Sequence, residues 1–312
     1  MERSKAFFIN GGAGRVICSI PAFEMYEKES ADKDFIIVCE GGTELFKGHP
    51  TLDARTYDVW HKNLFSDHLK HRDIVSLEPY RIWEYYNQKC SLAQAFDIEI
   101  NKQGIRDLPK PTLMLSKEEL LTGRKLVSDV KEKLKKQKTI VFQPFGRGIQ
   151  YIDESFVDTT SRSLEFTDIK QLTKKLQEKH FAVIFMSEIK FDTRSWGLKD
   201  DVAIPENLTL RHWAGLIKHA DHFFGCDSVG QHLAYAVDKS STVILGSTFP
   251  INVSYPNAKN FNILDFGELT REYSPIRITL DERIERKHET IMSMTPAIVD
   301  YTINAILGKK QK

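Results

Sequence analysis

The sequence has few cysteines, and they are widely spaced. Among 312 residues there are four, Cys18, Cys39, Cys90 and Cys226, and no two of them form a CxxC pair. Three of them lie in or beside apolar segments that are typical of buried strands. We therefore predict reduced, buried thiols rather than disulfides or metal ligands, as in a cytoplasmic protein of a bacterium or of a phage-infected cell.

Long apolar runs are also missing. No run approaches the roughly 20 residues that cross a bilayer, and the N-terminal segment MERSKAFFING breaks its apolar run at Asn10. We expect neither secretion nor a transmembrane segment. The formal net charge is only +1, which gives no overall attraction to nucleic acid but leaves room for a local basic surface.

The sequence lacks an intact dinucleotide-binding fingerprint. The pattern G-x-G-x-x-G requires a third glycine, and here Gly12 and Gly14 are followed by Ile17 at that position. An NAD(P)-dependent oxidoreductase therefore stands only as an alternative, which binding of NADH would support. The single Asp-x-Asp, residues 32–34, precedes a strand-like run instead of following one, so it is a poor metal site.

What the sequence does contain is an alternation of strand-like and helix-like segments. Apolar strand-like runs without an alternating pattern are typical of a parallel sheet that is covered on both faces. They cover residues 5–10, 34–40, 139–146, 181–187, 222–225 and 241–247. We predict an α/β protein of two doubly wound halves, residues 1–138 and 139–312, with short helices between about 50 and 110.

A polar cluster follows the strand-like run 222–225. In a parallel sheet, ligands bind beyond the carboxyl ends of the strands, where helix N-termini present free amide groups. Ser228 is placed to cap such a helix, Gly230 lets the backbone approach a ligand, and His232 lies one turn further on. This arrangement suits a diphosphate. The alternative is that Asp227 and Ser228 only cap a helix under which His232 packs.

The segment from 210 to 248 resembles the donor-binding half of glycosyltransferase family 9, the heptosyltransferase-like enzymes. Val229 stands where the family usually has glycine, and the glycine is displaced to Gly230. The segment around Arg162 is similar to the family's Lys/Arg-x-Trp-Pro motif, which implies a phosphate or sugar contact. The matching positions after 226 are Asp227, Ser228, His232, Leu233, Ala234, Ala236, Gly246 and Thr248.

The resemblance implies a GT-B fold, in which two Rossmann-like domains face a cleft. It implies a nucleotide-sugar held mainly by the second domain, residues 139–312, and an acceptor held by the first, residues 1–138. The helix N-terminus at 228–230, together with Arg162 and Arg147, would stabilise the leaving diphosphate. We therefore expect an inverting glycosyltransferase that needs no metal or other cofactor.

One departure from the family concerns the general base. Residues from Gly14 to Pro21 resemble the family's N-terminal loop, but Arg15 stands where the family has its aspartate. Arginine does not give up its proton in such a role, although it suits a phosphate or an anionic acceptor. Glu40, Glu44 and Asp153 are the alternative candidates for the general base. The competing interpretation of each is a solvated surface carboxylate.

The sequence does not identify the acceptor. The family implies a bacterial lipopolysaccharide or another glycan, whereas a hydroxymethylated base of phage DNA is the alternative. A DNA-facing surface would use the aromatic stretch 57–86 and a basic segment. The competing interpretation is that the basic segment is one solvated helix face and that the aromatic residues belong to the core. A non-catalytic nucleotide-sugar-binding protein is a third possibility. The basic residues are Arg124, Lys125, Lys131, Lys133, Lys135, Lys136 and Lys138.

Overall fold

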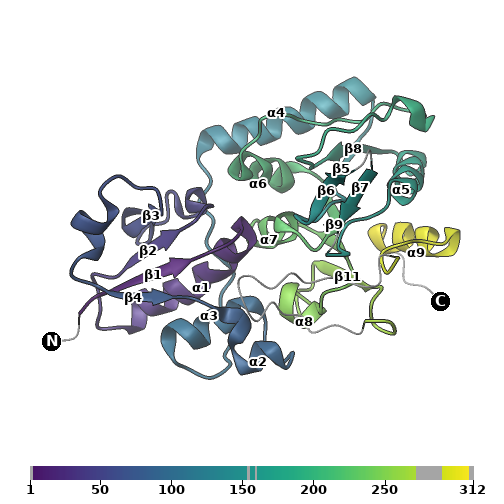
Figure 1. The fold of residues 1–312 in the computed structure, drawn as a ribbon. Coiled ribbons are helices and arrows are strands. Elements are labelled where there is room, and N and C mark those ends of the chain that lie inside the picture. The colour runs from purple at the N-terminus through teal and green to yellow at the C-terminus, as the bar shows by residue number, and fades with distance from the viewer. Residues whose placement is uncertain (1–2, 153–154, 159, 272–289, 309–312) are drawn as a thin grey trace. The chain divides into compact units, whose positions relative to one another are not determined.

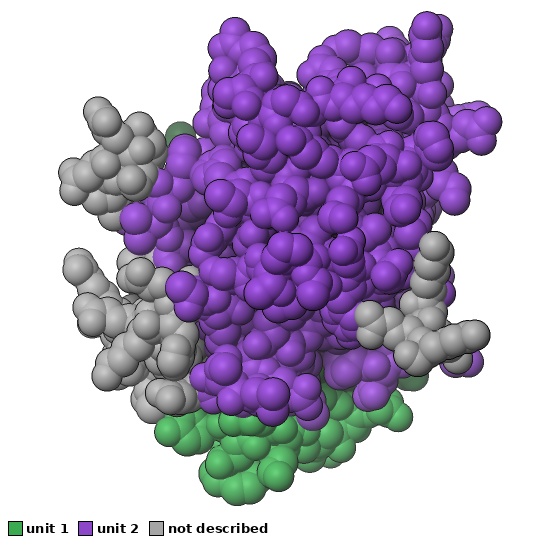
Figure 2. Space-filling view, turned by 90° about the vertical axis from the view of Figure 1, so that its right-hand side faces the viewer, with its two compact units in different colours: residues 1–116 green, residues 117–312 purple. Residues whose placement is uncertain are grey.

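The computed structural model describes residues 3–152, 155–158, 160–271 and 290–308, and it divides into two compact units. Unit 1 comprises residues 1–116 and unit 2 comprises residues 117–312, coloured green and purple in Figure 2. The division therefore comes earlier in the chain than the predicted junction near 138. The segment between the two positions is one long helix, α4 (Lys117–Leu134), that packs along another helix of unit 2.

Unit 1 contains a parallel sheet of four strands in the order β3-β2-β1-β4 (Figure 1). The strands are β1 (Lys5–Ile9), β2 (Ile36–Cys39), β3 (Thr56–Asp58) and β4 (Asp73–Ser76). The α-helices are α1 (Ala13–Glu29), α2 (Trp83–Tyr86) and α3 (Leu92–Asn101). Shorter turns of helix are η1 (Thr43–Phe46), η2 (Asp53–Arg55), the π-helix η3 (Leu64–Leu69) and η4 (Pro79–Arg81).

The prediction of short helices between 50 and 110 was incomplete, because two strands also lie there. β3 is only three residues long and half-buried, and β4 leaves three of its four residues exposed. Such edge strands carry no continuous apolar run, so the sequence pattern did not reveal them. Their pairing with β2 and β1 determines which residues follow the carboxyl edge of this sheet.

Aromatic side chains fill the space between the sheet of unit 1 and its helices. Phe7 on β1 packs edge-on against Phe23 and Tyr26 of α1, with ring centroids 5.5 and 5.1 Å apart. Phe35, just before β2, stacks on Phe23. α3 packs against α1. Burial of these rings fixes α1 over the sheet, with its N-terminus at the carboxyl end of β1.

Unit 2 contains a five-stranded sheet, in the order β11-β10-β9-β5-β8, in which all neighbouring strands are parallel. The strands are β5 (Lys138–Gln143), β8 (Phe181–Phe185), β9 (His222–Cys226), β10 (Ser241–Leu245) and β11 (Phe261–Asp265). A separate two-stranded antiparallel sheet consists of β6 (Ile149–Ile152) and β7 (Ser155–Asp158). The helices besides α4 are α5 (Phe166–Glu178), η5 (Arg194–Trp196), α6 (Leu210–His219), α7 (Val229–Ala236), α8 (Pro250–Val253) and α9 (Pro296–Ile306).

A buried ion pair and two glycines hold α4 against α6. The Nε and Nη2 atoms of Arg211 donate to the two carboxylate oxygens of Glu119 at 2.6 and 2.8 Å. Gly123 and Gly215 let the two backbones touch, since a Cβ at Gly123 would lie 2.3 Å from the carbonyl carbon of Gly215. This close packing is why α4 belongs to unit 2.

The predicted strand runs of unit 2 lie together in its core. Phe142 on β5 packs against Phe224 on β9 and Phe185 on β8, with ring centroids 4.5 and 5.3 Å apart. The four cysteines are buried, as predicted. In the part of the chain that the structure describes, no helix is long and apolar enough to cross a membrane.

Candidate functional site

The carboxyl ends of β5, β9 and β10 lie side by side in unit 2. β9 pairs with both β5 and β10, and the three strands end at Gln143, Cys226 and Leu245. The polar cluster predicted after residue 225, and the family-matching positions Gly246 and Thr248, therefore follow neighbouring strands. Each is followed by a helix, α7 or α8, as in other parallel sheets that bind ligands at this edge.

Gln143, which sequence analysis did not single out, caps α7. Its Oε1 accepts a hydrogen bond from the amide of Gly230 at 2.9 Å, and its Nε2 donates to Oγ of Ser228 at 3.2 Å. Ser228 occupies the N-cap position, but its side chain makes no capping hydrogen bond, contrary to the prediction. The capping residue, Gln143, comes from a neighbouring strand and precedes Gly230 by 87 positions. No local sequence motif reveals a capping contact over such a distance.

The glycines Gly230 and Gly246 lie closely packed against other side chains. A Cβ at Gly230 would lie 2.3 Å from Oε1 of Gln143 and 2.7 Å from the ring of Phe223. A Cβ at Gly246 would lie 2.5 Å from Sδ of Met292. The predicted role of Gly230, close approach of the backbone to a ligand, is thus not needed to explain the residue.

Asp227 and Arg162 are brought together although 65 positions separate them. Asp227 is 6% exposed, and its Oδ1 accepts a hydrogen bond from Nε2 of Gln231 at 2.9 Å. Its Oδ2 lies 3.8 Å from Nη1 of Arg162, whose side chain is 25% exposed. A buried carboxylate beside a partly exposed guanidinium orients the cation and leaves it a surface from which to reach an anion.

The turn that carries Arg162 is organised by Asp158, another residue that sequence analysis missed. Asp158 accepts hydrogen bonds from the hydroxyl and amide of Ser163, at 2.6 and 2.9 Å, and from the amide of Thr160 at 2.8 Å. Burial raises the pKa of Asp158, but these hydrogen bonds and the charge of Arg162 outweigh it and lower that pKa below its usual value. An aspartate that bonds amides two and five residues ahead is a recognisable turn signal.

Two further hydrogen bonds attach this turn to the strand ends. Oγ of Ser163 accepts from the amide of Gly146, after β5, at 2.9 Å. Oγ of Ser247, after β10, donates to the carbonyl of Thr160 at 2.6 Å. The turn with Arg162 is therefore tied to two strand ends, and Asp227 at the end of β9 lies beside it.

His232 lies on the buried side of α7 and contacts a tyrosine. Its Nδ1 is 2.8 Å from Oη of Tyr255, whose ring stacks on Tyr235 with centroids 3.6 Å apart. Burial lowers the pKa of His232 to about 4, although the charge of Asp227 opposes the shift. The imidazole is therefore neutral near pH 7.

The remaining predicted donor residues differ in their exposure. Thr248 is 7% exposed, and its Oγ1 has no hydrogen-bond partner within the described residues. Val229 is half-buried as the first residue of α7. Arg147, in the segment between β5 and β6, is exposed to solvent.

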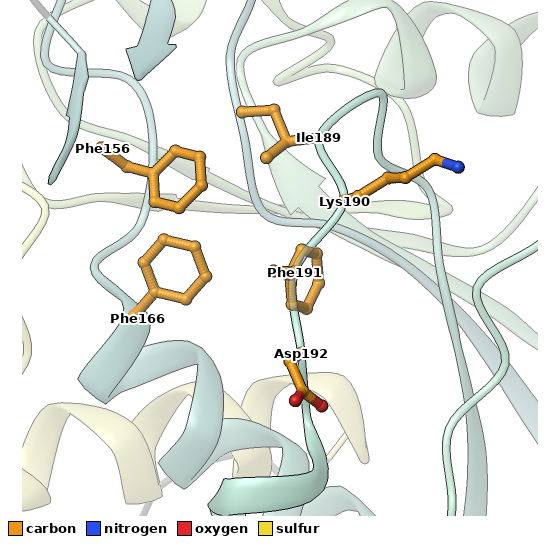
Figure 3. Close-up of a pocket in the computed structure, with 6 residues that line it drawn as sticks. All are labelled: Phe156, Phe166, Ile189, Lys190, Phe191 and Asp192. Carbon is orange, nitrogen blue, oxygen red and sulfur yellow. The ribbon is translucent and has the colours of Figure 1, made fainter. Parts of the chain in front are cut away.

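An apolar cavity of about 590 Å³, largely open to solvent, has lining residues that are close in sequence to Arg162. Phe156 lies two residues before Asp158, and Phe166 lies four residues after Arg162. Figure 3 shows the aromatic side chains of Phe156, Phe166 and Phe191 and the aliphatic side chain of Ile189 around this space. Lys190 and Asp192 complete the lining.

The candidates for acid–base chemistry have contrasting surroundings. Glu40 is exposed, and its Oε2 accepts a hydrogen bond from the amide of Gly11 at 2.8 Å. Glu44 is half-buried in the first turn of η1. Arg15 is 6% exposed in the first turn of α1. Asp153 lies outside the described residues.

Comparisons of the sequence found no match to any protein-family model or to any curated protein. Comparisons of the structure did find similar folds. A glycosyl transferase family 9 protein from Veillonella parvula superposes with a TM-score of 0.68 at 10% identity, over 99% of each chain.

Two structures from E. coli are also similar. ADP-heptose LPS heptosyltransferase II has a TM-score of 0.55 at 12% identity, and the match covers 98% of this chain and 99% of that one. Heptosyltransferase WaaC with ADP has a TM-score of 0.52 at 12% identity, over 84% of this chain and 92% of that one. The GT-B fold that the resemblance implied is therefore confirmed by the similarity to these three structures.

Proposed function

We propose that the protein is a glycosyltransferase that moves a sugar from a nucleotide-sugar to an acceptor hydroxyl. The observation that carries the proposal is the pairing of Arg162 with buried Asp227 beside the N-terminus of α7. The similar E. coli structures support it, since one is named for ADP-heptose and the other contains ADP.

In this proposal the donor diphosphate binds to unit 2 at the ends of β5, β9 and β10. Arg162 contacts the phosphates, and Asp227 orients Arg162 rather than touching the anion itself. The positive end of the α7 dipole adds to the favourable potential. Thr248 offers a hydroxyl at the same edge, and exposed Arg147 is an additional cation.

The chemistry requires negative charge to be stabilised on the leaving diphosphate as its bond to the sugar breaks. A preorganised guanidinium and a helix N-terminus supply that stabilisation without a metal ion. The one Asp-x-Asp sequence supports this choice, because both of its acids have protein partners. Asp32 accepts from the amide of Lys5 at 2.9 Å, and Asp34 pairs with Arg72 at 2.8 Å.

We further propose that the planar base of the donor lies in the cavity at Phe156, Phe166 and Phe191. Aromatic rings favour stacking with a base, and burial of its faces adds apolar area. The cavity is joined to the phosphate site by short segments of chain, since Asp158 and Arg162 each lie within four residues of one of its rings.

For the acceptor, a glycan is favoured over hydroxymethylated DNA. A DNA surface on α4 and the residues that follow it would need free cations, and three of the basic residues in this segment are close to carboxylates. Lys131 lies 2.9 Å from Asp221, Lys133 lies 3.3 Å from Asp201, and Lys136 lies 2.6 Å from Asp200. Their charge is thereby balanced within unit 2.

The test is a screen of sugar nucleotides, measuring binding by calorimetry and transfer to bacterial core oligosaccharide or hydroxymethylated DNA. We expect one donor to bind and to be consumed only when an acceptor is present, with or without a chelator. Transfer to DNA alone would replace the glycan assignment, and a strict need for divalent metal would contradict the charge argument. Binding of NADH with no binding of any sugar nucleotide would overturn the proposed function.

A further inference from the structure

Three neighbouring strands of unit 1 end together, and a polar side chain follows each of them. β1 is followed by Asn10, β2 by Glu40, and β4 by Leu77 and Glu78. β1 pairs with β2 through Ile9 and Cys39, and with β4 through Phe8 and Ser76. Glu40 and Glu78 therefore lie on opposite sides of Asn10, at the carboxyl edge where open α/β sheets bind ligands.

Glu78 is held in place at two points. Its Oε1 accepts a hydrogen bond from Nδ2 of Asn10 at 2.7 Å, and its backbone amide donates to Oε1 of Glu99 on α3 at 2.8 Å. The residue is half-buried. Within the described residues, Oε2 of Glu78 makes no hydrogen bond, so one oxygen is anchored while the other is available to a substrate.

Arg15 contacts residues on either side of Glu78. It is 6% exposed, its Nη2 donates to the carbonyl of Leu77 at 3.1 Å, and its guanidinium lies 4.8 Å from the ring centre of Tyr80. Its Nε and Nη1 are buried and, in the described part of the chain, have no hydrogen-bond partner. This buried cation, which lacks full pairing, offsets the charge of Glu99 and makes the corner unlike a simple solvated edge.

The corner contains other polar atoms that the protein leaves unsatisfied. Oδ1 of Asn10 and Oε2 of Glu99 are buried and, among the described residues, make no hydrogen bond. Burial raises the pKa of Glu99, although the hydrogen bond from Glu78 and the charges of Lys102 and Arg15 oppose the shift. Buried polar atoms gathered at one strand end are typical of a functional site.

The other carboxylates fit a catalytic role less well. Glu40 is exposed, and its hydrogen bond to the amide of Gly11 already fixes the turn before α1. Glu44 lies on η1, beyond the strand ends. Arg15 itself keeps its proton and presents buried nitrogens, so it does not act as a base.

We infer that Glu78 is the general base of the proposed transfer and that Arg15 is a positioning residue. Oε2 of Glu78 takes the proton of the acceptor hydroxyl while the acceptor oxygen forms its bond to the anomeric carbon. The bond from that carbon to the diphosphate oxygen breaks, and its electron pair leaves with the diphosphate. This inference rests on the proposed function, and it places the acceptor hydroxyl at the carboxyl edge of β1 and β4.

The test compares variants in steady-state transfer and in donor binding by calorimetry. Glu78→Gln keeps the shape of the side chain but cannot accept the proton, so we expect kcat to fall by about 100-fold or more with an unchanged donor Kd. Glu118→Gln, at an exposed position of α4, is the matched control and should keep full activity. If Glu78→Gln does not fold by circular dichroism, Glu78→Asp replaces it, because the shorter side chain withdraws the oxygen.

Arg15 is tested by substitution and partial rescue. Arg15→Met removes the hydrogen bond to the carbonyl of Leu77, and we expect a roughly 10-fold lower kcat with unchanged KM for donor and acceptor. Arg15→Lys keeps a charged donor and should recover part of kcat, which a loss of packing alone would not predict.

Two outcomes overturn the inference. Transfer by Glu78→Gln within a few-fold of wild type removes Glu78 as the base, and loss of transfer in Glu40→Gln but not in Glu78→Gln assigns the role to Glu40. Both results leave the proposed function intact, because the donor is still bound and used. Failure of the wild-type protein to bind any sugar nucleotide instead removes the proposed function.

Discussion

Gln143 and Gly230 form the contact that joins β5 to the N-terminus of α7, with Oε1 of Gln143 accepting from the amide of Gly230 at 2.9 Å. The pairing leaves little room for a side chain at position 230. An added Cβ would lie 2.3 Å from that oxygen. The proposed phosphate site therefore depends on a contact between a strand end and a helix that lie far apart in sequence.

Replacing Gly230 should destabilise unit 2. In Gly230→Ala the new methyl group meets Gln143 and the ring of Phe223, and we expect a loss of about 1–3 kcal/mol in the free energy of unfolding. Urea denaturation measures it. Gly104→Ala is the matched control, since no atom lies within 4 Å of its Cβ position. Equal stability of the two variants would show that Gln143 and Phe223 yield without cost.

The turn at Asp158 should control donor affinity through Arg162. Asp158→Asn weakens the hydrogen bonds from Ser163 and Thr160, and Arg162→Met removes the cation, so we expect donor KM to rise about 10-fold or more in each. Lys179→Met, an exposed cation after α5, is the control. Donor KM unchanged in Arg162→Met would remove this residue from the proposed site.

The cavity should contribute to donor binding through its aromatic rings. Phe191→Ala removes one wall, and we expect donor Kd to rise about 5- to 10-fold, which corresponds to about 1–1.4 kcal/mol. Calorimetry with the donor found in the screen measures the change. Phe65→Ala is a suitable control, because that ring is 67% exposed on unit 1. Identical donor affinity in the two variants would place the base elsewhere.

The ion pair of Glu119 and Arg211 should be a large contributor to the stability of unit 2. Glu119→Gln leaves a buried guanidinium without its counter-ion, and we expect a loss of about 3–5 kcal/mol. Thermal unfolding tests this expectation. Lys133→Met removes an exposed ion pair and should cost under about 1 kcal/mol. A comparable loss in both variants would contradict the argument from burial.

Stability should fall as the pH drops below 6.5, because two histidines are buried in the neutral form. Burial lowers the pKa of His222 and of His232 to about 4, whereas in the unfolded chain both titrate near 6.5. The unfolded state therefore binds more protons between pH 6.5 and 4. Each histidine should cost the folded state roughly 1–2 kcal/mol between pH 7 and 5.

Urea denaturation at pH 7 and at pH 5 measures this effect. His222→Gln should reduce the difference between the two pH values, since it removes one of the groups while keeping polar atoms near Ser240 and Thr242. A difference as large as that of wild type would show that His222 takes up its proton in the folded protein.

Much of the fold could be predicted from the sequence by itself. The apolar runs that became β1, β2, β5, β8, β9 and β10 were recognisable, because a strand buried on both faces needs apolar side chains at every position. The polar cluster after residue 225 followed from the same pattern. The short edge strands β3 and β4 were not predicted, because pairing with neighbouring strands, and not their own composition, makes them strands.

Only the tertiary structure decided which polar residues meet. Asp227 and Arg162 lie 3.8 Å apart across 65 positions, and Gln143 reaches Gly230 across 87. Glu78 was overlooked because its strand β4 was not recognised. The physical reason is the same in each case. Local patterns report the burial that one segment requires, whereas a site is assembled at the ends of strands whose order in a sheet is set by packing across the whole unit.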